Sequence, residues 1–239
     1  MNDSNERTSI LSRITKDRER TNLLKKHEQN LIVFLLKHIP PKVTSDMLTA
    51  VGFAGGFLTA AGFVAATYSH RAFLLLGVLG FAVNWFGDSL DGRLAYLRNK
   101  PRKWYGFSLD FTVDWLTNIL IGYGYIVYVG GQWELLGFGF VVLYGWAMMT
   151  ALLRYKITNR YTIDSGLLGP TEVRIIISMF LVLEMFVKSS IIYTGALACI
   201  ILLTVNVADF IQLLKIADRR DRDDRDGKNG SNGKTSKKR

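Results

Sequence analysis

Four aspartates lie close together in one short stretch of the chain, residues 87–114. Asp88 and Asp91 stand three positions apart, and Asp110 and Asp114 stand four apart. Residues with either spacing share one face of a helix. The eight residues 98–105 form a short connection, so we expect antiparallel helices whose carboxylates meet. Such carboxylates repel one another unless cations lie between them. An oxygen-only cluster selects Mg²⁺ or Mn²⁺, and two such ions suit a pyrophosphate substrate because they neutralise its oxygens.

Three small residues flank these aspartates. Gly92 and Ala95 lie on or near the face of the first aspartate pair, and Gly106 lies one turn before the second pair. None would obstruct a ligand, although helix packing explains any single glycine more simply. Paired structural charges are the alternative interpretation of the aspartates. No basic residue alternates with them at matching depth, so we favour the metal site.

The composition of the whole chain is that of a membrane protein. Of 239 residues, 49% are hydrophobic and 21% are charged, the net charge is +10, and the mean hydropathy is +0.17. The charges gather at the ends and in two short blocks, a separation typical of integral membrane proteins. This pattern excludes a disordered chain, and the single cysteine, Cys199, excludes a secreted disulfide scaffold. The polar first 20 residues predict no cleavable signal peptide.

Six segments have about the length and apolarity of a transmembrane helix, which needs about 20 residues. They cover residues 47–68, 72–97, 106–129, 133–153, 171–187 and 190–214. Lipid cannot satisfy exposed backbone groups, so the expected fold is all-α and polytopic. The glycines of the first span suit close helix packing, and Gly52-xxx-Gly56 is a weak signal for a dimer. Asp88 lies about 24 Å along its span, so about 6 Å short of the boundary of a 30 Å core.

The distribution of Lys and Arg predicts the orientation. Residues 1–46 hold nine, residues 98–105 four, residues 154–170 three and the tail from Lys215 ten, whereas the opposite side holds only Arg71 and Lys188. Basic residues favour the cytoplasmic side. We therefore expect both termini and the aspartate cavity to face the cytoplasm, with the protein in the inner (cytoplasmic) membrane of the cell.

The composition of the two chain ends divides the protein into three predicted regions. Residues 1–45 form a cytoplasmic segment in which residues 21–38 place Leu24, Leu31, Leu35 and His38 on one helical face. This pattern fits an amphipathic helix on the membrane surface, or equally an ordinary packed helix end. Residues 46–215 form the six-helix catalytic domain. The charged residues 216–239 are expected to be a disordered tail.

The spacing Asp88-x-x-Asp91-Gly92-x-x-Ala95, followed by Gly106-x-x-x-Asp110-x-x-x-Asp114, closely resembles the signature of the CDP-alcohol phosphotransferases. Residues 40–52, PPKVTSDMLTAVG, resemble the family's lead into its first span, and residues 169–172, GPTE, resemble a segment of choline/ethanolamine phosphotransferases and many bacterial relatives. Most of residues 40–215 is covered. The resemblance implies a six-helix membrane enzyme, often a homodimer, that transfers a substituted phosphate from a CDP-alcohol to another alcohol and releases CMP.

The resemblance also implies roles for individual residues. Asp88, Asp91 and Asp110 hold two divalent ions, and Asp114 is the general base for the acceptor hydroxyl as well as a metal ligand. The implied donor-binding positions are Thr44, Gly92, Ala95, Tyr96, Arg98 and Gly106.

One position departs from the family pattern. Tyr96 stands where the family usually has an arginine, which is implied to steady the phosphates of the nucleotide. At 100° per residue, Arg98 lies about 20° around the helix from Asp91, and Tyr96 about 140°. Arg98 could therefore supply the missing charge from one turn further along. The alternative is a donor that binds more weakly or differently.

The acceptor is left open by the sequence. Arg154, Lys156 and Arg174 stand where relatives that use a phosphorylated acceptor, such as inositol phosphate or glycerol phosphate, carry basic groups. Positive-inside topology accounts for Arg154 and Lys156 equally well. Arg174 lies inside a span and favours a functional role. Glu172 fits an amine acceptor or donor, or an ion pair with Arg174.

The expected function is metal-dependent phospholipid synthesis from a CDP-alcohol, with CDP-diacylglycerol as the favoured donor. The expected partners are that donor, a small alcohol acceptor, membrane lipid and a second copy of the chain, with no nucleic acid. Two alternatives stay open. An intramembrane prenyltransferase is suggested by Asn84-xxx-Asp88-xx-Asp91, although such proteins are longer and carry their second motif far downstream. A cation carrier would need carboxylates near mid-membrane, where only Glu184 and Asp209 are further candidates.

Overall fold

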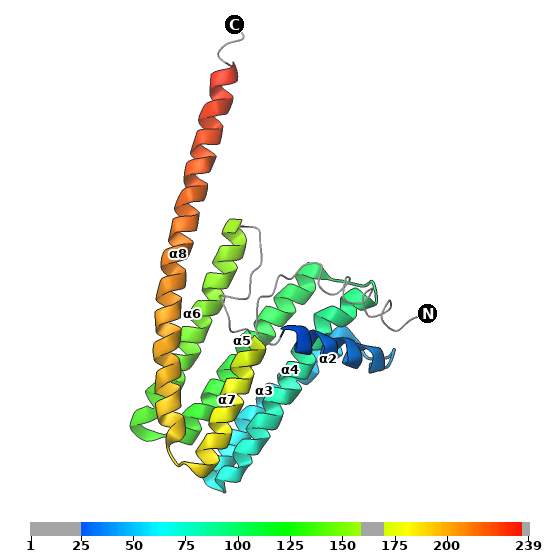
Figure 1. Ribbon diagram of the computed structural model, residues 1–239, viewed down its shortest axis with the longest axis vertical. Helices are drawn as coiled ribbons and strands as arrows, with labels where there is room; N and C mark the ends of the chain where they lie inside the picture. Colours follow the sequence, from blue (N-terminus) through cyan, green and yellow to red (C-terminus); the bar gives the residue numbers. More distant parts are fainter. Residues whose placement is uncertain (1–24, 159–169, 236–239) are drawn as a thin grey trace.

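The computed structural model describes residues 25–158 and 170–235, with side chains from residue 28 to 158 and 170 to 225. Over this part of the chain the protein is helical and has no strand (Figure 1). The helices are α2 (Lys25–His38), α3 (Ser45–Tyr68), α4 (Leu74–Leu97), α5 (Lys103–Val129), α6 (Glu134–Thr158), α7 (Pro170–Phe186) and α8 (Ser190–Thr235), with the short 3₁₀ turns η1 (Arg71–Phe73) and η2 (Gly131–Trp133).

Within these ranges, four helices are long and apolar enough to cross a membrane. They are Ser45–Tyr68, Arg71–Leu97, Gly131–Thr158 and Ser190–Arg225. The described part of the chain is thus all-helical, with four candidate membrane-spanning helices. The sequence predicted six spans. Helix α7 has only 17 residues, and α5, although 27 residues long, carries two aspartates that lower its hydropathy.

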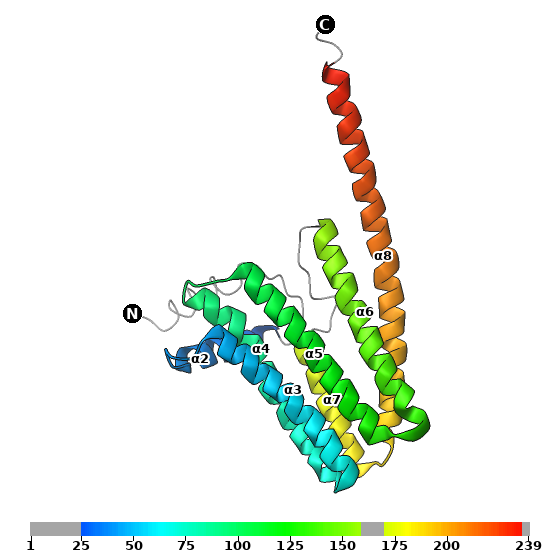
Figure 2. The ribbon, with the colours of Figure 1, turned by 180° about the vertical axis from the view of Figure 1, so that it is seen from behind.

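The long helices run up and down in one bundle. The turns η1 and η2 and the connection between α7 and α8 lie at one end, and the connection between α4 and α5 lies at the other (Figures 1 and 2). The first of these ends carries Arg71 and Lys188. The other end, close to the aspartates, carries residues 98–103, four of which are basic.

Helices α3 and α4 approach each other closely because glycines face one another along their contact. A Cβ on Gly87 would lie 2.3 Å from the backbone nitrogen of Gly52 and from the carbonyl oxygen of Leu48. A Cβ on Gly55 would lie 2.4 Å from the backbone nitrogen of Asn84. The glycines of the first predicted span therefore pack within this chain. A dimer is not needed to explain the Gly52-xxx-Gly56 pattern.

Helix α2 packs across the bundle near the C-terminal end of α4. Its Ile32, Val33 and Leu36 are buried in a cluster with Leu48, Leu90 and Leu94. The sequence had placed Leu31, Leu35 and His38 on the apolar face, with Leu24, which lies outside the described residues. Leu31 and Phe34 form an exposed apolar strip on α2, at 46% and 55% exposure, while Ile32 is fully buried against the bundle. The predicted contact of α2 with the membrane surface stays a prediction.

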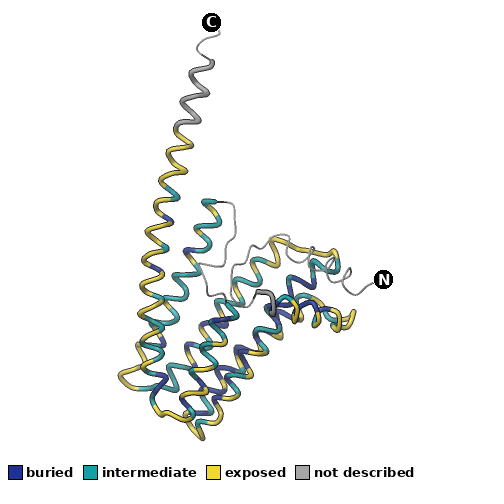
Figure 3. The backbone as a smooth tube through the Cα atoms, in the orientation of Figure 1, coloured by how far each residue is buried: buried dark blue, intermediate teal, exposed yellow. Residues whose placement is uncertain are grey.

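Helices α6 and α8 form the outer pair of the bundle. Only 11% of the apolar stretch of each is buried, against 50% in α3 (Figure 3). At the start of α8, buried Glu184 accepts hydrogen bonds from the backbone nitrogens of Ser189 and Ile191, at 2.9 Å each, and from the hydroxyls of Ser190 and Tyr128, at 3.0 Å each. Glu184 thus satisfies the first free N–H groups of α8, a structural role.

The C-terminal region differs from the sequence expectation. Residues 216–239 were predicted to be disordered, but α8 continues to Thr235, and the last four residues lie outside the described range. Alternating charges support this extension, since Arg222 pairs with Asp218 one turn earlier. Arg220 also donates to the carbonyl oxygens of Lys156 and Ile157 at the end of α6. The extension is therefore tied to the bundle at its base.

Candidate metal and lipid site

Three of the four aspartates come together between α4 and α5. Asp88, Asp110 and Asp114 each offer a carboxylate oxygen, and these oxygens lie within 4.8 Å of one another. All three side chains are half-buried. Oxygen atoms so placed are the ligands that hard divalent cations prefer. The donor set therefore fits a Mg²⁺ or Mn²⁺ ion.

Asp91 was predicted as a fourth ligand; its carboxylate is not one of these three and bonds to α3 and to its own helix. Its Oδ2 accepts a 2.6 Å hydrogen bond from the hydroxyl of Thr49, and its Oδ1 accepts one from the backbone nitrogen of Gly92. Asp91 and Thr49 are both 7% exposed. The hydroxyl of Ser45 also donates to the backbone oxygen of Asp91, at 2.8 Å. Helix α3 thus fixes the position of Asp91, a role of Thr49 that the sequence analysis missed.

Arg174 supplies a positive charge that the sequence analysis had not paired with the aspartates. Its Nη2 lies 2.7 Å from Oδ2 of Asp88, and the two side chains are 16% and 23% exposed. The statement that no basic residue matches their depth was therefore wrong, because α7 approaches from a distant part of the sequence. Arg174 pairs with Asp88 rather than with Glu172, which is buried on the same helix.

The three carboxylates of the cluster lie close together, and that of Asp88 is paired with the guanidinium of Arg174. Carboxylates this close repel one another when they are ionised. A divalent cation between them, or a proton on one of them, would relieve that repulsion.

Polar side chains continue one turn deeper on both helices. Asn84 precedes Asp88 by four residues and donates to the carbonyl oxygen of Gly52, at 3.0 Å. Asn118 follows Asp114 by four residues, and its side-chain nitrogen is buried without a hydrogen-bond partner among the described residues. The i, i+4 spacing places each amide on the aspartate face of its helix. This spacing was visible in the sequence and could have suggested a polar floor to the site.

Four of the predicted donor-binding residues lie near the start of α3 or the end of α4. Arg98 donates to the carbonyl oxygens of Pro40, at 2.9 Å, and Val43, so its charge holds the segment before α3 rather than the aspartates. The helix-face argument failed because α4 ends at Leu97 and Arg98 is its C-cap. Thr44 is the N-cap of α3 and accepts from the backbone nitrogen of Met47. Ala95 and Tyr96 are half-buried in the last turns of α4.

The two glycines of the motif differ in their surroundings. Gly92 is half-buried and donates its backbone N–H to Asp91. Gly106 is exposed, and a Cβ built there would meet no atom within 4 Å. Packing in this chain therefore does not require a glycine at 106, which leaves room for a ligand.

The other predicted acceptor residues lie apart from Arg174. Arg154 and Lys156 were expected in a loop, but both lie in the last turns of α6, and the loop residues 159–169 are outside the described range. Arg154 pairs with Asp209 of α8 at 3.5 Å, and Lys156 is exposed. The structure thus brings only Arg174 of the three to the carboxylates.

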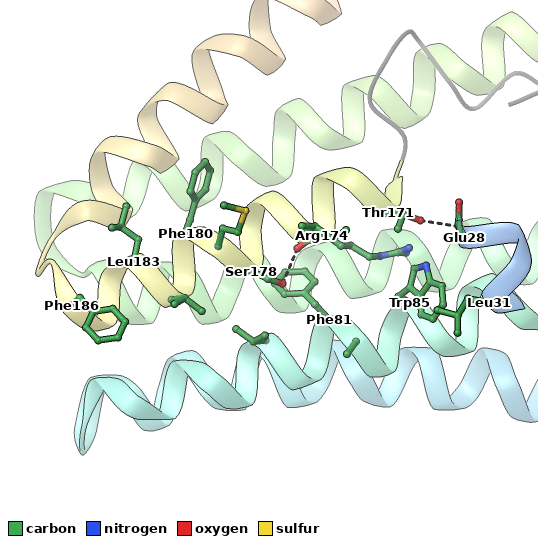
Figure 4. Close-up of a pocket in the computed structure, with 15 residues that line it drawn as sticks. Glu28, Leu31, Phe81, Trp85, Thr171, Arg174, Ser178, Phe180, Leu183 and Phe186 are labelled. Carbon is green, nitrogen blue, oxygen red and sulfur yellow. Dashed lines mark hydrogen bonds between the residues drawn. The ribbon is translucent and has the colours of Figure 1, made fainter. Parts of the chain in front are cut away.

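A cavity of about 910 Å³ runs between α4 and α7 and meets the cluster at Arg174 (Figure 4). Its lining is apolar along most of its length, with Phe186 and Leu183 at the far end. At the near end, the hydroxyl of Thr171 donates to Oε1 of Glu28 on α2, at 2.9 Å. The groove therefore has one polar mouth, where Arg174 is shared with the aspartate cluster. Sequence pattern alone gave no sign of it.

No family model matches this chain, and no curated protein matches it. The resemblance to CDP-alcohol phosphotransferases accordingly stays a hypothesis that rests on the spaced residues.

Proposed function

We propose that this protein is a metal-dependent phosphotransferase of the CDP-alcohol type that acts in phospholipid synthesis. It transfers a substituted phosphate from CDP-diacylglycerol to an alcohol acceptor and releases CMP. The observation that carries the proposal is the meeting of three carboxylates and Arg174 at the mouth of an apolar groove. A lipid linked to a charged nucleotide needs both parts of such a site.

The residues of the cluster have distinct roles in this proposal. Asp88, Asp110 and Asp114 would hold the divalent metal, which would supply positive charge for the phosphate oxygens and for the departing CMP. Asp114 accepts the proton of the acceptor hydroxyl. Arg174 has further N–H groups beyond the one that contacts Asp88, and these bind a phosphate oxygen. Asp91, anchored by Thr49, fixes the turn of α4 on which Asp88 stands.

The apolar groove supports a lipid-linked donor. Acyl chains that lie along Phe186, Leu183 and Phe81 would place their head group at Arg174. Both ends of the donor are then satisfied, the chains by apolar contact and the phosphates by charge. A phosphorylated acceptor such as inositol phosphate or glycerol phosphate stays open, because Nη2 of Arg154 lies 3.5 Å from Asp209 but has no hydrogen-bond partner among the described residues.

In a membrane, we propose that α5 and α7 complete a six-span bundle with the four apolar helices. Both run alongside their neighbours in the bundle, α7 over a shorter length (Figure 1). The basic connection at 98–103 then places the aspartates on the cytoplasmic side. The exposed strip of Leu31 and Phe34 on α2 suits contact with the lipid surface.

Release of CMP tests this function directly. The purified protein is incubated with CDP-diacylglycerol, Mg²⁺ or Mn²⁺ and a panel of alcohols, among them serine, glycerol phosphate and inositol phosphate. We expect CMP release that requires the metal and stops when a chelator is added. Turnover in metal-free buffer would contradict the metal site. Absence of CMP with every acceptor, together with prenyl transfer or cation flux, would favour one of the two alternative functions.

A further inference from the structure

Lys103 continues the line of aspartates on α5 toward the connection with α4. It stands seven residues before Asp110 in the same unbroken helix, so the two positions lie within about 20° of one helix face. Asp88 of the antiparallel helix α4 meets Asp110 in the cluster, and Ala95 follows Asp88 by seven residues on the same face of α4. Lys103 and Ala95 therefore lie at the same level, about 10.5 Å from the cluster.

The surface between the cluster and Lys103 carries small side chains. Gly106 lies one turn before Asp110 on α5, is exposed, and has no atom within 4 Å of where a Cβ would be. On α4, Ala95 contributes only a methyl group. The apolar groove leaves the cluster elsewhere, at Arg174 between α4 and α7. A ligand held at the carboxylates thus has a second direction in which to extend, over Gly106 toward the basic connection.

The charge of Lys103 is not used within the protein. Arg98 bonds to backbone carbonyls of the segment before α3, and Arg102 pairs with Asp46. Lys103 is exposed, and within the described residues it forms no ion pair. Its Nζ lies 5.8 Å from the ring centroid of Trp104. An ammonium on a flexible four-carbon stem is free to turn toward an anion, and the stem covers roughly half of the distance to the cluster.

We propose that Lys103 binds the phosphate of the nucleotide part of the donor, which is the phosphate that leaves on CMP. This inference rests on the proposed function and deepens it, because it assigns the two parts of the donor to two directions. The lipid-linked part lies at Arg174 with its chains in the groove, and the nucleotide extends over Gly106 toward Lys103. Lysine binds phosphate as a compact positive charge.

The test measures binding of CMP and of CDP-diacylglycerol to the protein in nanodiscs with Mn²⁺ present. We expect Lys103→Gln to weaken the binding of both about 10-fold, the lower end of the range for a hydrogen bond to a charged group. Lys103→Arg keeps the positive charge and should stay within about threefold of the wild-type affinity. The matched control is Lys100→Gln, which removes an exposed lysine of the same connection that lies outside both helices and should not change either affinity.

The possible results separate the two levels of the proposal. If Lys103→Gln binds both ligands like the wild-type protein, the role of Lys103 is overturned and the proposed function stands. An equal loss in Lys100→Gln overturns it as well, because the effect is then one of general surface charge. So does a loss in Lys103→Arg as large as in Lys103→Gln, because the charge is then not what matters. If the wild-type protein binds neither CMP nor CDP-diacylglycerol, the proposed function itself fails.

Discussion

At the scale of single residues, Asp114 is the group whose loss should stop the reaction. We expect Asp114→Asn to abolish CMP release while donor binding partly survives, because an amide cannot accept the hydroxyl proton but still fits the cavity. Turnover and lipid binding are measured on the same preparation. Asp46→Asn is the matched control, since Asp46 forms an exposed pair with Arg102 and is not one of the three clustered carboxylates. Near wild-type turnover of Asp114→Asn would reassign the base.

Arg174 gives a prediction in which two measurements change in opposite directions. The guanidinium pairs with Asp88, so it partly neutralises the carboxylates that would hold a cation. Arg174→Gln should therefore tighten Mn²⁺ binding, because a like charge is removed from the metal site. It should weaken binding of CDP-diacylglycerol about 10-fold or more, because a charge-assisted contact to phosphate is lost. A purely structural ion pair would weaken both.

At the scale of elements, the contact between α3 and α4 sets the position of the aspartates. A Cβ at Gly87 would lie 2.3 Å from two backbone atoms of α3, which cannot move as a flexible side chain can. We expect Gly87→Ala to cost about 1–3 kcal/mol of stability, the range for overpacking. Thermal unfolding in detergent measures it. Gly139→Ala on α6 is the control, since a Cβ there meets nothing within 4 Å and alanine favours the helix.

Arg98 also acts at the scale of elements, because it joins the end of α4 to the segment before α3. Arg98→Ala removes the hydrogen bonds to the carbonyl oxygens of Pro40 and Val43. We expect faster amide exchange over residues 39–44 and a stability loss of about 1–2 kcal/mol. Donor affinity of the folded protein should stay within about threefold. A much larger loss of donor affinity, with unchanged exchange, would restore Arg98 as the phosphate ligand. Lys100→Ala on the same connection serves as the control.

At the scale of the whole molecule, the bundle has two ends whose charges predict its orientation. Single cysteines are introduced as Lys100→Cys or Lys188→Cys in a Cys199→Ala background. Each one reports on which side of the membrane its end of the bundle lies. We expect a membrane-impermeant maleimide to label Lys188→Cys in intact cells, and Lys100→Cys only after the membrane is opened. The reverse pattern would place the aspartates on the outer side, away from cytoplasmic CDP-lipids. Labelling of both in intact cells would contradict the six-span arrangement.

The sequence by itself determined the helical membrane class and the start and end of most helices. Long apolar runs leave only helices in lipid, and the turns at residues 69–73 and 130–133 fall where the hydropathy breaks. It also predicted that the four aspartates would meet, because a short connection makes α4 and α5 antiparallel neighbours, and the structure groups three of them, Asp88, Asp110 and Asp114. The six spans stay a prediction for α5 and α7.

Only the tertiary structure decided which groups surround those aspartates. Thr49 and Arg174 stand 42 and 86 residues from their partners Asp91 and Asp88, and no local spacing relates such positions. The same holds for the groove, whose walls come from α2, α4 and α7. Arg98 illustrates a limit of sequence-based reasoning. Helix geometry predicts which residues share a face only within the helix, and α4 ends at Leu97. Helical periodicity fixes relations within one helix, whereas the relations between helices follow from how their surfaces pack.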